Sequence, residues 1–360
     1  MGVGSSQCQQ LRGTVVDLRG SQQPMANSCD IPPDWMSWIT ENQRLGVPDT
    51  TIIKIMVDNG FDAAMAQEKV ARSGNRWTPS ISDLMARKLN KLESLMIIYS
   101  KLWQCRGTVG VDRVSGLSCE AFFRWYYSTN TPVVLLDLMS NWSALQRWTP
   151  QYLKARCGHE IVEVMTGRNA DPQYEMNCEF HKTHMPLAQY IDNVESIGKT
   201  NDFYIVANNH SLDTGNMGQL LDDIQFFDGI LDPRNARQKV FLWFGPAGTV
   251  TPLHHETMNV LFAQVLGRKL ITLIPSFETN LVYNHVGVYS EVDCEAPDYN
   301  RHPLFRNVSR LEVLLEPGEV LFIPVGWWHH VRSLDISISV SFTNFLASND
   351  YDWDGSAYRP

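Results

Sequence analysis

Two histidine pairs and one glutamate have the residue types and the spacing that metal chemistry requires. His254, His255 and Glu256 are consecutive, and His329-His330 lies far downstream. In a strand, residues i and i+2 point to one face, so His254 and Glu256 can share a ligand while His255 faces away. Each residue alone is more often a surface or core residue than a ligand. Together, two ligands from one strand and one distant histidine form a 2-His-1-carboxylate set, which leaves open positions on iron(II).

Short strands must position these ligands, because the surrounding segments are rich in β-branched and aromatic residues and are interrupted by turns. The turns include Leu266-Gly267-Arg268 and Glu316-Pro317-Gly318-Glu319. Strands at this density predict a mainly β fold, an antiparallel barrel or jelly roll. The expected strands are Val240–Phe244, Met258–Val265, Lys269–Ile274, Leu311–Leu315, Val320–Ile323, Trp328–Arg332 and Ile336–Phe342.

The last of these strands alternates between apolar residues and serines. Ser337, Ser339 and Ser341 share one face, opposite the isoleucine, valine and phenylalanine side chains. Such alternation is typical of a strand with one buried and one solvated face. A strand that follows a metal histidine can instead turn its serines towards a ligand cavity, and the sequence leaves both interpretations open.

The chain before Lys239 predicts a mixture of elements and a division into domains. Residues 1–30 lack periodicity and predict a disordered or loosely attached segment. Residues 31–109 predict a helical region for dimerisation or substrate recruitment, and the glycines within Arg106–Ser118 indicate a linker before a catalytic domain at residues 110–360. We expect helices from Pro33 to about Leu45, at Thr50–Asn59, at Ala63–Arg72, at Ser80–Trp103, around Phe122–Trp125, from Pro150 to Gly158 and at Gln219–Phe227. Asp49 and Asp62 are the expected N-caps of the second and third of these helices. Strands are expected at Pro132–Leu136, Glu160–Met165 and Asp202–Ala207.

Composition narrows the classes of function. The net charge of -9 argues against a nucleic-acid binder, because phosphate contacts require clustered lysine and arginine. Seven cysteines without a CxxC motif predict neither a disulfide framework nor a zinc ribbon, so we expect a reducing, cytoplasmic setting. No apolar run approaches the length of a membrane span, and no secretory signal is expected.

Four segments carry a resemblance to a known family: TVTPLHHE, NVLFAQVLGRK, EPGEVLFIPVGWWHH and SISVSF, in this order. They resemble the JmjC-type branch of the cupin superfamily, the iron(II)- and 2-oxoglutarate-dependent oxygenases. They are most similar to the small hydroxylases typified by the asparaginyl hydroxylase that inhibits hypoxia-inducible factor. A weaker likeness extends upstream to about Thr131. The resemblance implies a double-stranded β-helix of the cupin or jelly-roll type, with the N-terminal helical region outside it.

The resemblance also implies a metal site. His254, Glu256 and His329 would bind iron(II), with His329 rather than His330 chosen by its register after the two tryptophans. Adjacent strand residues point to opposite faces, so only one of that pair should reach the metal. Oxygen and 2-oxoglutarate would be cosubstrates, and succinate and carbon dioxide co-products.

A second set of residues matches the cosubstrate contacts of this family. Lys269 matches the lysine that pairs with the far carboxylate of 2-oxoglutarate, and Thr251 and Tyr204 match the hydroxyl groups that assist it. A lysine that faces a barrel interior also requires an anion on physical grounds.

Departures from the family pattern leave the substrate open. Glu256 stands where the hydroxylases usually have aspartate, although other JmjC branches have glutamate. Asn259 and Val260 replace a glutamine and an asparagine near the cosubstrate, and Thr343 replaces a tryptophan. The long segment Ser276–Arg310 is expected to cover the site.

Three functions are therefore considered. The first is hydroxylation of a peptide, protein or amino-acid-derived substrate. The second is demethylation of an N-methyl group, and the third is a non-catalytic cupin binding module. The apolar positions of Ser80–Trp103 further predict a homodimer.

Overall fold

The computed structural model describes residues 31–44, 47–76, 81–105, 110–207, 211–213, 215–284 and 287–351. The expectation for residues 1–30 lies outside this part of the chain. The chain divides into two compact units between Leu92 and Glu93. No helix within the described ranges has the length and apolar character needed to cross a membrane.

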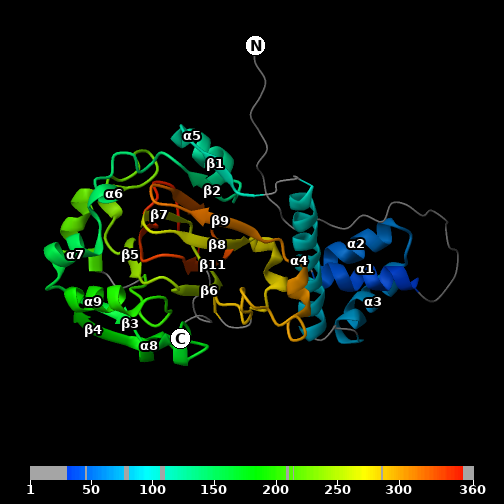
Figure 1. Cartoon of the computed structure of the whole chain (residues 1–360). Helices are drawn as coiled ribbons and strands as arrows, with labels where there is room; N and C mark the ends of the chain where they lie inside the picture. Colours follow the sequence, from blue (N-terminus) through cyan, green and yellow to red (C-terminus); the bar gives the residue numbers. More distant parts are fainter. Residues whose placement is uncertain are drawn as a thin grey trace, which may run out of the picture. The chain divides into compact units, whose positions relative to one another are not determined.

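The first unit contains three short helices, drawn in blue in Figure 1: α1 (Pro33–Arg44), α2 (Asp49–Asp58) and α3 (Ala63–Arg76). Gly60 follows α2 with a φ of 93°, a conformation that glycine adopts without strain. The Asp62 carboxylate accepts a hydrogen bond from the Met65 backbone N–H at 2.9 Å, as expected for an N-cap. Asp49 is not a cap, because the N-cap position of α2 is Pro48. The unit's core consists of Ile31, Trp38, Ile39, Val47, Ile52, Met56, Ala66 and Val70.

The boundary between the units lies inside α4 (Ile81–Gln104), whereas the sequence analysis placed it at residues 109 and 110. The C-terminal turns of α4 belong to the second unit and contact its other elements. Ser100 donates a hydrogen bond to Glu278, and the Trp103 ring lies 5.5 Å from that of Trp327. These contacts explain why the second unit begins before the helix ends.

The second unit is built around two facing sheets. Together they form a double-stranded β-helix, drawn mainly in yellow to red in Figure 1. The larger sheet has the order β1-β2-β10-β7-β12-β5, and the smaller has the order β6-β11-β8-β9. All pairs are antiparallel except β1 with β2. The strands are β1 (Asp112–Val114), β2 (Val133–Leu135), β5 (Val240–Gly245), β6 (Val250–His255), β7 (Val260–Leu266), β8 (Lys269–Ile274), β9 (Leu311–Leu315), β10 (Val320–Ile323), β11 (Trp328–Ser333) and β12 (Ser337–Phe342).

Three apolar layers hold the second unit together. One fills the space between the sheets and includes Phe262, Ile271 and Leu273. Another joins the outer face of the larger sheet to the helices that Figure 1 draws in green. The helices and strands between β1 and β5, apart from β2, are α5 (Cys119–Phe122), the π-helix η1 (Phe123–Tyr127), α6 (Ala144–Arg147), α7 (Pro150–Cys157), β3 (Ile161–Met165), α8 (Cys178–His181), β4 (Lys182–Pro186) and α9 (Leu187–Ile197), with the 3-10 helices η2 (Arg168–Ala170), η3 (Ser211–Asp213), η4 (Gly218–Asp223) and η5 (Pro233–Asn235).

The third layer covers the outer face of the smaller sheet and corrects an expectation. The segment after β8 contains η6 (Ser276–Leu281) and η7 (Pro303–Asn307), and its Val282 and Phe305 pack against Leu253, Ile274 and Trp328. Most of Ser276–Arg310 therefore packs on the outside of the barrel because it carries its own apolar residues, and only a short part of it reaches the candidate site described below.

The serines of β12 face the barrel interior. Ser339 donates a hydrogen bond to the Gln264 side chain at 2.8 Å, and Ser341 accepts one from Trp243 Nε1 at 2.8 Å. Ser337, Ser339 and Ser341 are each at most 3% exposed. The interpretation of a solvated serine face is wrong, because the second sheet covers this face.

Several other upstream expectations also differ from the structure. Gln219–Phe227 is not an α-helix but contains the short 3-10 helix η4, and Asp202–Ala207 contributes only isolated bridges at Tyr204 and Ile205. β1 lies within the expected linker, and β4 and α9 were not expected. Each of these elements depends on a partner distant in sequence, such as β2 for β1.

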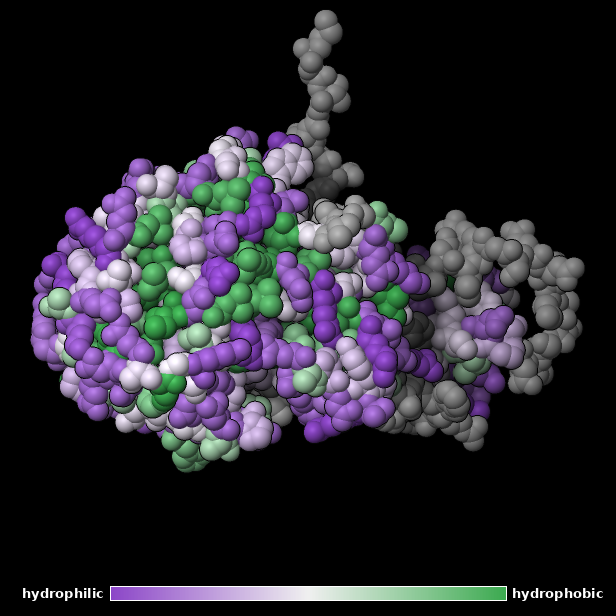
Figure 2. Space-filling view, viewed as in Figure 1, coloured by the Kyte–Doolittle hydropathy of each residue, from purple (hydrophilic) through white to green (hydrophobic). Residues whose placement is uncertain are grey.

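A cavity of about 330 Å³ lies between β1 and β9, lined by residues that include Val111, Arg113 and Leu314. Figure 2 shows hydrophobic side chains near the middle of this view, surrounded by hydrophilic ones. The cavity lining includes none of the histidines singled out above.

Candidate active site

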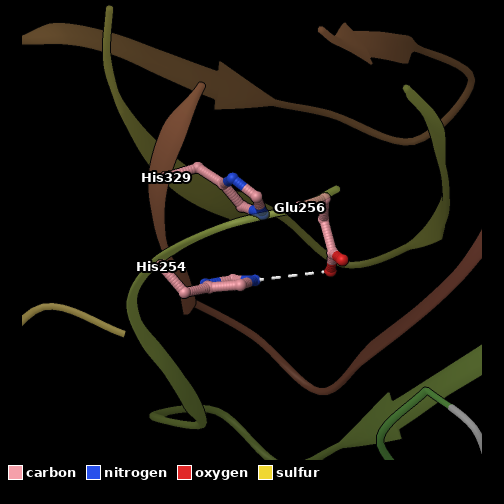
Figure 3. Close-up of side chains that lie close together, drawn as sticks. All are labelled: His254, Glu256 and His329. Atoms are coloured by element: carbon pink, nitrogen blue, oxygen red, sulfur yellow. Dashed lines mark ion pairs between the residues drawn. The ribbon is translucent and has the colours of Figure 1, made fainter. Parts of the chain in front are cut away.

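Two neighbouring strands place His254 and His329 side by side inside the barrel. β6 and β11 pair antiparallel, with His254 opposite His329. The two ring centroids are 4.0 Å apart. Glu256 follows directly after β6, and one ligand atom from each of the three residues lies within 4.8 Å of the others. Figure 3 shows the three side chains converging on one point.

Backbone carbonyls fix the orientation of both imidazoles. Nδ1 of His254 lies 2.8 Å from the Pro252 carbonyl, and Nδ1 of His329 lies 3.0 Å from the Trp327 carbonyl. A carbonyl accepts hydrogen bonds, so each Nδ1 carries the proton and each Nε2 keeps its lone pair for a metal. Nε2 of His254 is 3.6 Å from the Glu256 carboxylate, the pair joined by the dashed line in Figure 3.

The electrostatics of this cluster suit a divalent cation. Burial lowers the pKa of His329 well below its ordinary value, so this ring is neutral. Burial also lowers the pKa of His254, but Glu256, the Pro252 carbonyl and the charge of Glu175 together outweigh that effect and the net pKa is raised. A charged His254 would carry a proton on Nε2, facing the Glu256 carboxylate. A cation bound between the three side chains would replace that proton as the partner of Glu256. The donor set of two imidazoles and one carboxylate fits iron(II).

The neighbouring histidines point away from this cluster. The ring of His255 packs against Trp328 at 4.7 Å, and Nε2 of His330 lies 3.9 Å from the Glu295 carboxylate. Within the described residues, no second group of three histidine, cysteine, aspartate or glutamate ligands lies as close together.

A β-bulge in β6 brings a further residue to the same interior face. Thr251 is opposite Val331, and His254 is opposite His329, so two residues of β6 face one residue of β11 between these pairs. Without the bulge, residues three apart would point to opposite faces. Pro252 lies in the bulge, on an edge strand, where a missing N–H is tolerated.

Thr251 belongs to a second cluster, centred on Lys269. Nζ of Lys269 donates a hydrogen bond to the Tyr204 hydroxyl at 3.1 Å, and Thr251 lies next to Tyr204. Lys269 is 0% exposed, and its Nζ lies 4.8 Å from the centre of the Phe262 ring. Burial alone lowers the pKa of Lys269 to about 7. An anion beside this ammonium group would offset the cost of its burial.

Part of the segment after β8 forms the rim of the site. The Ser290 N–H donates to the Leu253 carbonyl at 2.8 Å, and the His255 N–H donates to the Val288 carbonyl at 3.0 Å. The Tyr289 ring lies 5.6 Å from the His254 ring.

Other residues near the site were missed by the sequence analysis. Arg168 and Glu175 form a buried ion pair at 2.6 Å next to β6. Asn259 connects the segment after Glu256 to two distant parts of the chain, because its side chain hydrogen-bonds both Asn349 and Val325. These partners lie up to 90 residues apart, and no local pattern marks them.

Comparison with known proteins agrees with this geometry. Residues 119–349 match the family model of the cupin-like domain. The chain is 33% identical to lysine-specific demethylase JMJ30 of Arabidopsis thaliana over 276 residues, 75% of this chain and 63% of that protein. It is 33% identical to lysine-specific demethylase 8 of Xenopus tropicalis over 231 residues, 62% of this chain and 50% of that protein. It is 30% identical to HSPB1-associated protein 1 of Bos taurus over 235 residues, 60% of this chain and 48% of that protein.

The matched region therefore spans about half to five-eighths of the length of these curated relatives. The family model covers more than half of this chain, including both strands that carry the histidines and the strand that begins with Lys269. The chain belongs to the cupin-like JmjC family.

Proposed function

We propose that this chain is an iron(II)- and 2-oxoglutarate-dependent oxygenase that oxidises a C–H bond of a protein or peptide substrate. The observation that carries the proposal is the pairing of two clusters inside one barrel. A 2-His-1-carboxylate set and a buried lysine, which has no anionic partner among the described residues, come from adjacent strands. The first suits an open iron site and the second suits a dicarboxylate that reaches it.

The residues have separate parts in this proposal. His254, Glu256 and His329 would hold iron(II), and Lys269, Tyr204 and Thr251 would bind the far carboxylate of 2-oxoglutarate. When bound, iron(II) with 2-oxoglutarate and oxygen supplies the oxidising power that removes hydrogen from the substrate, with succinate and carbon dioxide as co-products.

The protein's own contribution is orientation and exclusion of water. The carbonyls of Pro252 and Trp327 hold both imidazoles in one tautomer, so neither ring must reorganise when a metal binds. Lys269 is completely buried, so its hydrogen bond to a carboxylate would be shielded from water. Tyr289 lies beside His254 on the rim, where a substrate would approach.

The C–H bond that is oxidised has two candidate locations. Two of the relatives are named lysine-specific demethylases, which favours an N-methyl group of lysine in a protein or peptide. The similarity of four segments to the small asparaginyl hydroxylases favours a stable hydroxylation of an unmethylated side chain. The two activities begin with the same hydrogen removal and differ in the product, because a hydroxylated N-methyl group is lost as formaldehyde.

One experiment tests the proposal and separates the two activities. Iron-loaded protein is incubated with 2-oxoglutarate and paired peptides, with and without N-methyllysine, and succinate and peptide mass are measured. Loss of one methylene from the methylated peptide indicates demethylation, and gain of one oxygen by the unmethylated peptide indicates hydroxylation. A protein that binds neither iron(II) nor 2-oxoglutarate would be a non-catalytic module, and the proposal would be wrong.

A further inference from the structure

Arg168 is a buried cation that none of the roles above uses. Its side chain is 0% exposed, and its guanidinium group donates to three separate partners. Nη2 donates to Glu175 at 2.6 Å and to the Val250 carbonyl at 2.8 Å, and Nη1 donates to the Asn201 side-chain oxygen at 3.0 Å. A buried ion pair is often no more stabilising than apolar residues of the same volume, so stability alone does not explain this group.

Two of these contacts fix the beginning of β6. This strand is at the edge of its sheet, so part of its backbone has no neighbouring strand. At Val250 the missing partners are side chains: the N–H donates to Asn201 at 2.8 Å, and the carbonyl accepts from Arg168 and from the Tyr174 hydroxyl at 3.2 Å. Val250 immediately precedes Thr251, so these bonds restrain the backbone from which the Thr251 side chain extends.

The same guanidinium group also packs against the ring of Tyr204. Its central carbon lies 5.3 Å from the centre of the Tyr204 ring and 4.2 Å from the centre of the Tyr174 ring. Tyr204 has little secondary structure to hold it, since it forms only an isolated bridge to Met165. Arg168 is thus in contact with both elements that supply hydroxyl groups next to Lys269.

We propose that Arg168 is a positioning residue of the 2-oxoglutarate pocket. It touches no cosubstrate atom and acts through Tyr204 and Thr251, with Glu175 neutralising its charge. The planar fork of an arginine can serve the three acceptors and stack on two rings at once, which the single ammonium group of a lysine cannot. This inference rests on the proposed function, because the pocket it serves is the proposed one.

The test compares Arg168→Met and Arg168→Lys with the wild type. The matched control is Arg147→Met, which removes another arginine paired with a buried carboxylate, that of Asp223. Iron(II) affinity and 2-oxoglutarate affinity are measured separately by calorimetry without oxygen, and kcat and KM are measured with any substrate that turns over. Unfolding by urea reports the stability of each variant.

We expect Arg168→Met to raise the dissociation constant of 2-oxoglutarate by about tenfold or more, the loss that follows from misplacing one charge-assisted hydrogen bond. Arg168→Lys should show a smaller rise, and iron(II) affinity should stay within about threefold of the wild type because no iron ligand contacts Arg168. Arg147→Met should lower stability and leave both affinities unchanged.

Two results would overturn the inference. An unchanged 2-oxoglutarate constant in Arg168→Met, with a loss of stability like that of Arg147→Met, would make Arg168 a structural residue only. If Arg168→Met does not fold, the same criterion applies to Arg168→Lys, which keeps the charge. Absence of 2-oxoglutarate binding by the wild type would refute the proposed function itself, whereas normal binding by the wild type and by the Arg168 variants would refute only the positioning role.

Discussion

Replacing Lys269 by methionine separates the effect of a buried charge on stability from its effect on cosubstrate binding. The pKa of Lys269 is about 7 in the folded protein, against 10.5 for an ordinary lysine, and burial is the cause. A shift of this size corresponds to roughly 5 kcal/mol, an upper limit for the cost of keeping the ammonium group charged in the empty pocket. Methionine has a similar length and no charge, so the variant removes this cost.

The sign of the pH effect follows from the direction of the shift. Because the pKa is lower in the folded state, the folded protein binds fewer protons than the unfolded chain between pH 7 and pH 10.5. The contribution of Lys269 to the free energy of unfolding is therefore greatest above pH 10.5 and is lost as the pH falls towards 7. In the absence of cosubstrate, Lys269→Met should be more stable than the wild type near pH 6.5, and the difference should shrink by pH 9.

When iron(II) and 2-oxoglutarate are present, the wild type should instead be more stable than Lys269→Met. A charge-assisted hydrogen bond contributes about 1.5–3 kcal/mol, so Lys269→Met should weaken 2-oxoglutarate binding at least tenfold. In the wild type, the dissociation constant should also rise as the pH increases above 7, since the free lysine loses the charge that the carboxylate requires. The variant should lack that rise.

Urea unfolding at pH 6.5 and pH 9, with and without iron(II) and 2-oxoglutarate under nitrogen, measures all of these quantities. Lys154→Met is the control, because Lys154 is 40% exposed on α7 and pairs with Asp192 at the surface. The control should change neither the pH dependence nor the stabilisation by cosubstrate. The reasoning is refuted if Lys269→Met matches the wild type both in the pH dependence of its stability and in its stabilisation by cosubstrate. That result would place Lys269 outside the pocket.

Further predictions concern the metal, Asn349 and helix α4. His329→Ala should abolish iron(II) binding measured by metal analysis, whereas His330→Ala should retain it, and the opposite result would contradict the strand register. Asn349→Ala should weaken iron(II) binding severalfold in calorimetry, because the Asn349 side-chain oxygen accepts a hydrogen bond at 2.8 Å from the backbone N–H of Asn259, three residues after Glu256; unchanged affinity would make this contact irrelevant to the site. The exposed apolar residues Leu95, Ile98, Tyr99 and Leu102 of α4 predict a homodimer in light scattering that glutamate at Leu95 and Tyr99 dissociates, and a monomeric wild type would exclude it.

The sequence predicted the barrel strands well where the signal is local. The expected bounds of Lys269–Ile274, Leu311–Leu315 and Val320–Ile323 agree with β8, β9 and β10. These strands are apolar runs bounded by glycine and proline turns, so their limits depend on neighbouring residues alone. The sequence also identified the three side chains that the structure brings together, because a histidine-X-glutamate motif and a histidine after a tryptophan pair are visible without knowledge of the fold.

The contacts that hold the site could not be predicted in this way. Arg168 bonds the carbonyl of Val250, 82 residues away, and Asn259 bonds Asn349, 90 residues away. Neither contact has a spacing that a single sequence reveals. The bulge in β6 has a similar cause, since it is defined by the register of β11 and not by the residues of β6 alone.

The position of β6 at the edge of its sheet explains why these distant contacts gather at the site. An edge strand has backbone groups without a neighbouring strand, and those groups require partners from elsewhere. Near Thr251 the partners are side chains of the Arg168 segment, and near His254 they are the backbone groups of Val288 and Ser290. The strand that carries His254 and leads into Glu256 therefore pairs with β11 on one side and is bordered by loops on its other edge. Loops can differ between relatives while the barrel and the ligands stay the same, so we expect these two segments to determine which substrate reaches the metal.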